Sequence, residues 1–153
     1  QVVEIYERAG LLTRDELRAR QEIYREQYCK TVRTEANLVI RMARTIIFPA
    51  AMRYQGELAA TAARMRDIGL EIRTTPLEEV TSSLRRLQDA TARLETSLAA
   101  CGGLGEGLEA ARRYCDEVLP LMGEVRGHAD TLETLVADDL WALPNYQEIL
   151  FGK

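Results

Sequence analysis

Histidine, cysteine and the large aromatic residues are scarce in this sequence, whose 153 residues include one His, three Cys, one Trp and two Phe. Cys29, Cys101 and Cys115 are too few and too widely spaced for a disulfide framework or a zinc site. His128 has no Cys or His at metal-ligand spacing, so we expect it to be a solvated helix residue and neither a ligand nor a base. The small number of scattered cysteines favours a reduced, cytoplasmic setting.

Long apolar runs and a strong net charge are also missing. No apolar run approaches the roughly 20 residues of a membrane span, and no signal-peptide pattern opens the chain. The net charge of −4 gives no reason to expect nucleic acid. Residues 1–69 carry 12 basic and 9 acidic side chains, and residues 70–153 carry 8 and 15. We therefore expect the two parts of the chain to pack against each other, with neither a membrane nor a nucleic acid as partner.

Residues 13–69 predict one very long first helix. Thr13 and Glu16 form a capping box at its start, and no glycine follows until Gly56. A single apolar stripe recurs at helical spacing along its second half: Ala36, Ile40, Ala43, Ile47, Ala50 and Tyr54. Pro49 should kink this helix, because a proline ring crowds the carbonyl four residues earlier. The β-branched cluster at residues 31–34 is the expected position of any break, where Thr34 could cap a new helix.

Two further helices, at residues 75–101 and 104–139, complete the predicted fold. Thr75 and Glu78 are expected to form a second capping box. A heptad seam follows: Val80, Leu84, Leu87, Thr91, Leu94, Leu98 and Cys101. The third helix carries a similar seam and a kinking Pro120: Leu104, Leu108, Ala111, Cys115, Val118, Met122, Val125, Ala129, Leu132 and Val136. We predict an all-α, antiparallel three-helix bundle in one domain, residues 1–153, with no strand.

Two parts of the chain are expected to lie outside this bundle. The second helix is too short to cover the whole first helix, so residues 13 to about 42 are predicted to have no partner within it. This part either folds back at residues 31–34 or rests on protein outside this chain. The tail, residues 140–153, is expected to be an irregular docked strap with Trp141, Tyr146, Leu150 and Phe151 as its large residues.

No catalytic, cofactor-binding or metal-binding residue is assigned from the sequence. The glycine-rich residues 102–107 match no phosphate loop and are interpreted as a turn between helices. Cys29 and Cys115 lie on or beside apolar stripes, so both are expected to be buried small hydrophobic residues. The remaining candidates are acidic pairs, expected to be solvated, and arginines, expected to pair with the acidic half or a partner: Glu78-Glu79, Asp116-Glu117, Asp138-Asp139, Arg41, Arg44 and Arg53.

Two stretches carry a resemblance to a known family. The first is EIYREQYCKTV at residues 22–32, followed by EANLVIRMARTIIFPAAMRYQ at residues 35–55. The second is the closing pattern D-x-L-E-x-L-V…LW-x-LP-x-Y-x-E-x-L-F at residues 130–151. Together they resemble the C-terminal region of type III glutamine synthetases. The resemblance implies a parent enzyme that joins ammonia to glutamate with ATP and Mg²⁺ or Mn²⁺, in a large ring-shaped oligomer. The family's catalytic residues and cofactor sites lie upstream of this region, so no cofactor is expected in this chain.

Three functions remain open at this point. The first is a non-catalytic C-terminal domain that braces the catalytic portion or neighbouring subunits through Leu17, Tyr24, Tyr28 and the tail, within a cytoplasmic homo-oligomer. The chain begins at Gln1 in mid-pattern, which fits the expectation of a fragment of that larger enzyme. The second is a free-standing helical module for protein interaction or self-association. The third is a small helical enzyme with an unrecognised site, although the chain alone is not expected to be active.

Overall fold

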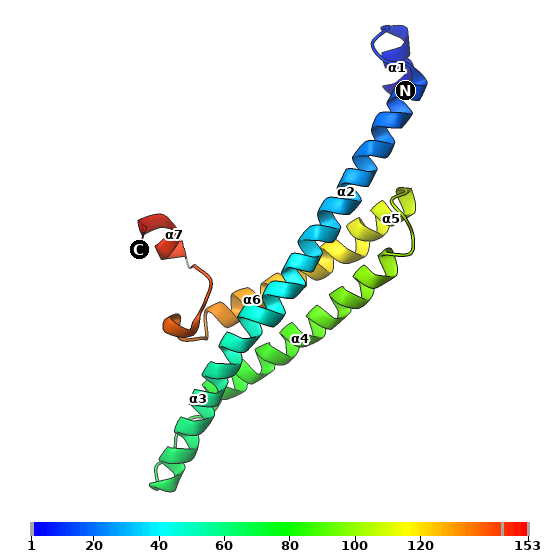
Figure 1. Ribbon diagram of the computed structural model, residues 1–153. Coiled ribbons are helices and arrows are strands. Elements are labelled where there is room, and N and C mark those ends of the chain that lie inside the picture. Colours follow the sequence, from blue (N-terminus) through cyan, green and yellow to red (C-terminus); the bar gives the residue numbers. More distant parts are fainter. Residues whose placement is uncertain (1, 145, 153) are drawn as a thin grey trace.

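The long first helix dominates the computed structural model, which describes residues 2–144 and 146–152 (Figure 1). It runs without interruption through three consecutive elements: α2 (Arg14–Met42), a π-helical turn η1 (Ala43–Ile47) and α3 (Phe48–Asp67). An antiparallel hairpin packs along it, made of α4 (Thr75–Cys101), α5 (Leu108–Arg113), a second π-helical turn η2 (Tyr114–Val118) and α6 (Leu119–Glu133). Three short elements flank these: α1 (Val2–Arg8), the 3₁₀ turn η3 (Asp138–Leu140) and α7 (Tyr146–Phe151). The predicted all-α fold is confirmed for the described residues.

The ends of the long helix follow its sequence signals. The N–H of Glu16 donates to Thr13 Oγ1 at 3.2 Å, and the N–H of Thr13 donates back to the Glu16 carboxylate at 2.8 Å, as a capping box predicts. At the other end, Gly69 adopts φ 77°, and the N–H groups of Gly69 and Leu70 bond to the carbonyls of Arg66 and Met65. This left-handed glycine satisfies the last free carbonyls and ends the helix.

The helix does not break at residues 31–34. Val32 is 4% exposed and lies in the core, where it holds the helix against the hairpin. The hydroxyl of Thr34 donates to the carbonyl of Lys30 at 2.9 Å, so it is satisfied inside the helix and does not cap a new one. Core packing therefore outweighs the weak helix preference of the β-branched residues.

Both internal prolines lie immediately after a π-helical turn. Pro49 is the second residue of α3, after η1, and Pro120 is the second residue of α6, after η2. Proline has no N–H to donate, and its ring crowds the carbonyl four residues earlier. A π-helical turn is wider than an α-helical turn, so it gives that carbonyl more room and moves the bonding partners by one residue. The kink expected at each proline is therefore observed as a π-helical turn, and the helix continues beyond the proline.

The second π-helical turn changes which residues of the third helix face the core. From the last residue of the turn onward, the predicted positions Val118, Val125 and Leu132 are buried. At its first residue, Tyr114 is buried, at 2% exposure, while the predicted Cys115 beside it is exposed. The same shift appears earlier in the helix, where Ala110 is buried in place of the predicted Ala111 and the predicted Leu108 is 50% exposed. The turn adds one residue to the spacing, so the expectation that Cys115 is buried was wrong by one position.

The seam of α4 faces the core as predicted. All its members are buried except Leu98, which is half-buried and packs against the core. The one polar member, Thr91, donates its hydroxyl to the carbonyl of Leu87 at 2.7 Å, so it enters the core without an unpaired group. Leu87 and Leu94 are 1% and 0% exposed. Full burial of each such side chain stabilises the fold by about 1.5–3 kcal/mol.

Three predicted helix boundaries need correction. Thr74 precedes α4 in place of Thr75, and its hydroxyl donates to the Glu78 carboxylate at 2.7 Å, so no capping box forms. The third helix begins at Leu108 and not at residue 104, because Gly105, with φ 69°, extends the turn between the helices. It ends at Glu133 and not at residue 139, because the N–H groups of residues 135 and 136 both return to the Leu132 carbonyl.

The hairpin covers a stretch of the long helix that lies nearer the N-terminus than predicted. Gln55 donates to Thr81 Oγ1 at 2.6 Å near the start of α4, and Glu106, in the turn after α4, lies 3.8 Å from Lys30. The connection between α3 and α4 brings the chain back along α3 before α4 begins, so α4 covers a stretch nearer the N-terminus (Figure 1). The covered stretch therefore runs from about residue 55 to residue 29, and the long helix extends past the hairpin at both ends (Figure 1). The prediction of an uncovered stretch reaching residue 42 was wrong.

The one-residue shift at η2 gives a matched test of stability. Tyr114→Ala should lower the free energy of unfolding by about 3 kcal/mol or more, because it empties a filled core position. Cys115→Ala should change it by less than about 0.5 kcal/mol, since that side chain is exposed. Urea unfolding followed by circular dichroism measures both. A larger loss for Cys115→Ala than for Tyr114→Ala would contradict the shifted register.

The same shift predicts unequal thiol reactivity. Cys29 and Cys101 are buried, and burial raises the pKa of both thiols, so the reactive thiolate is rare and inaccessible. Cys115 is exposed and should react quickly with a chromogenic disulfide reagent. We expect one fast thiol per native chain, absent in Cys115→Ser, and three fast thiols in denaturant. Equal rates for all three thiols in the native chain would contradict this packing.

Candidate functional site

The groups that could carry chemistry do not form a reactive centre in the described part of the chain. None of the described His, Cys, Asp and Glu residues gather in a group that could hold a metal ion. The three acidic pairs are exposed, as expected, and residues 102–107 form the turn between α4 and α5. His128 differs from the prediction: its side chain is 25% exposed and its Nε2 lies 3.7 Å from Glu124, which also pairs with Arg93. It lies partly buried beside the Arg93–Glu124 ion pair and is not a freely solvated residue.

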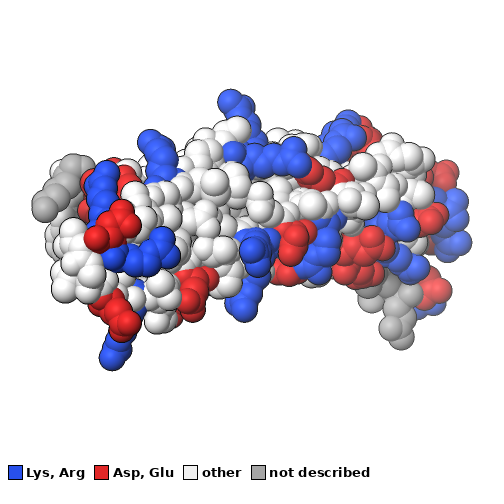
Figure 2. Space-filling model, turned by 90° about the horizontal axis from the view of Figure 1, so that it is seen from below, with Lys and Arg blue, Asp and Glu red and all other residues white. Residues whose placement is uncertain are grey.

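Oppositely charged side chains join the long helix to the hairpin. Arg44 pairs with Glu95 of α4, as predicted, while Arg41 and Arg53 form no ion pair with any described residue. The Arg53 Nε donates instead to the carbonyl of Pro49 at 3.4 Å. Basic and acidic side chains are interspersed over the face shown in Figure 2. Exposed pairs of this kind set the alignment of helices more than they add stability.

A small ion-pair cluster marks the point where the hairpin ends. The carboxylate of Glu106 lies 3.8 Å from Lys30 and 4.0 Å from Arg33. Lys30 also binds Glu26 one turn earlier in α2, and this hydrogen bond lowers the pKa of the Glu26 carboxyl and raises the pKa of the Lys30 ammonium. The cluster holds the α4–α5 turn beside residue 30. Everything before it in α2 projects past the hairpin (Figure 1).

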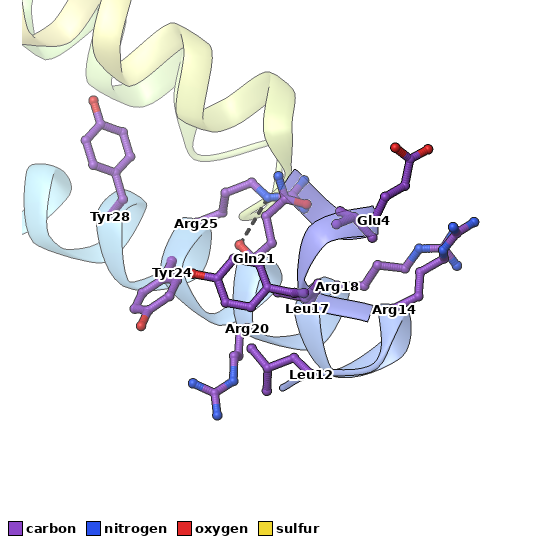
Figure 3. Close-up of a pocket in the computed structure, with 12 residues that line it drawn as sticks. Glu4, Leu12, Arg14, Leu17, Arg18, Arg20, Gln21, Tyr24, Arg25 and Tyr28 are labelled. Carbon is purple, nitrogen blue, oxygen red and sulfur yellow. Dashed lines mark hydrogen bonds between the residues drawn. The ribbon is translucent and has the colours of Figure 1, made fainter. Parts of the chain in front are cut away.

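The projecting part, α1 with residues 13–28, is named the arm here. α1 folds back beside the start of α2, where Glu7 pairs with Arg14 at 3.2 Å. A hollow of about 970 Å³ opens between these two helices and along α2 (Figure 3). Four arginines and one glutamate line it together with apolar and aromatic side chains: Val3, Glu4, Tyr6, Leu12, Arg14, Leu17, Arg18, Arg20, Gln21, Tyr24, Arg25 and Tyr28. The lining is partly aromatic and has more basic than acidic side chains, although Arg14 and Arg18 already pair with Glu7 and Asp15.

The arm continues the buried face of the bundle. One stripe in the arm has spacings of four, three and four, and the buried Val32 lies four residues beyond its last member: Leu17, Gln21, Tyr24 and Tyr28. Tyr28 is half-buried and packs against the core, where burial raises the pKa of its hydroxyl and the neighbouring Cys115 raises it further. Tyr24, one turn further out, is 67% exposed. The same helix face is therefore covered inside the bundle and open in the arm.

The C-terminal segment divides into a docked part and an exposed part. Leu140, Trp141 and Leu143 are half-buried and pack against the core, as predicted for a strap. The indole N–H of Trp141 is buried and finds no acceptor among the described residues. Beyond Pro144 the chain leaves the bundle and α7 lies apart from it (Figure 1).

The last part of the tail is not docked on this bundle, and the expectation that it docks on another surface stays a prediction. Three consecutive apolar side chains of α7 are exposed: Ile149 at 65%, Leu150 at 69% and Phe151 at 76%. These last apolar side chains are not covered by the bundle. The side chain of Tyr146 lies outside the described residues.

Sequence reasoning identified Leu17, Tyr24 and Tyr28 as the open stripe, and the structure places all three on the hollow of the arm. It did not identify the basic residues beside them. Arg14, Arg18 and Arg25 recur with Gln21 at spacings of four, three and four, so they follow the same helix face. That periodicity was present in the sequence and could have been read as a cationic face.

Each helix in the described residues falls short of the long, uncharged apolar stretch needed to cross a bilayer. Residues 1–66 match the family model described as the glutamine synthetase C-terminal domain. The chain is also similar to a type-3 glutamine synthetase of Dictyostelium discoideum, with 28% identity over 97% of this chain and 21% of that protein. A glutamine synthetase of Butyrivibrio fibrisolvens is 26% identical over 98% of this chain and 22% of its own length.

A glutamine synthetase of Bacteroides fragilis (strain YCH46) is 27% identical over 90% of this chain and 20% of its own length. The chain thus spans about a fifth of the length of these relatives. No solved structure matches it. The family model covers the first of the two stretches that carry the sequence resemblance, and together these similarities confirm that the chain resembles the C-terminal domain of type III glutamine synthetases.

Proposed function

We propose that this chain is a non-catalytic helical C-terminal domain of a type III glutamine synthetase that braces the catalytic portion or the contacts between subunits. The observation that carries the proposal is the arm, whose open face continues the buried seam of the bundle. A helix face of this kind is typical of a surface that packs against more protein. In the parent enzyme the reaction would be the ATP-dependent ligation of ammonia to glutamate.

The geometry suits a mechanical role. The hairpin holds the long helix between about residues 29 and 55, and the helix has no break where it leaves the bundle. From Arg14 to Tyr28 the arm rises roughly 21 Å at 1.5 Å per residue. A continuous helix keeps the orientation set by its packed part, so the arm would hold whatever it contacts at a fixed distance from the bundle.

The proposal assigns the chemistry to the catalytic portion of the parent enzyme. ATP and Mg²⁺ or Mn²⁺ would bind there, and this chain would contribute contacts to that portion and to neighbouring subunits of a homo-oligomer. A cytoplasmic location belongs to the same proposal, since three cysteines without a disulfide suit a reducing compartment. The alternative is a self-associating helical module, which would use the same exposed stripe without a catalytic partner.

Binding to the catalytic portion tests the bracing role. We expect the intact chain to bind the purified catalytic portion of a type III glutamine synthetase in isothermal calorimetry. Leu17→Glu should weaken this binding about tenfold or more, because it places a charge on the open stripe. Leu38→Glu, a matched change at an exposed leucine on the bundle, should leave it unaltered. If the unsubstituted chain does not bind, the bracing role fails and the self-associating module remains.

A second test concerns activity. The chain alone, supplied with ATP, glutamate, ammonia and Mg²⁺, should form no glutamine, because its described residues provide no grouped metal ligands for a nucleotide-dependent reaction. Coupled detection of ADP and direct detection of glutamine measure this. The catalytic portion under the same conditions is the positive control, and turnover by the chain alone would sink the assignment of a non-catalytic domain.

A further inference from the structure

We draw no further inference here: the strongest candidate, the open face of the arm with the hollow that Leu17, Tyr24 and Tyr28 line, belongs to the surface already assigned to the bracing role, and nothing in the structure shows what covers it.

Discussion

One helix face, longer than the hairpin that covers it, determines the rest of this structure. The apolar stripe of the long helix extends from Leu17 to beyond Ala51, whereas α4 and α5 reach only from about residue 55 to residue 29. Apolar burial is the main favourable term in folding, so the stretch with two packed partners is fixed and the remainder is left for another surface. The fold, the open arm and the proposed contacts all follow from this difference in length.

The stability of the covered part comes from close packing more than from charge. Leu87, Leu94 and Leu132 are at most 1% exposed and lie in one continuous core with residues of the long helix. The ion pairs around Glu106 and Glu95 are at least partly exposed, where each contributes little. Their role is positional, since they fix where the hairpin ends and hence where the arm begins.

The two π-helical turns reconcile proline with long continuous helices. Each gives room for a proline two residues later, and each keeps the helix unbroken across the centre of the bundle. The consequence differs between the helices. In the third helix the extra residue brings Tyr114 into the core and leaves Cys115 outside. A straight helix with the same sequence would present a different face to α4.

Sequence periodicity determined the helices, the α4 seam, the capping box at Thr13 and the stop at Gly69, because each depends on residues within a few positions of one another. The resemblance to glutamine synthetases was likewise available from two local stretches. Only the tertiary structure decided the offset of the hairpin along the long helix, the face on which Tyr114 lies and the release of Leu150 and Phe151 from the bundle. The physical reason is that these features depend on contacts between segments far apart in the chain, where packing outweighs the local preferences that a sequence pattern records.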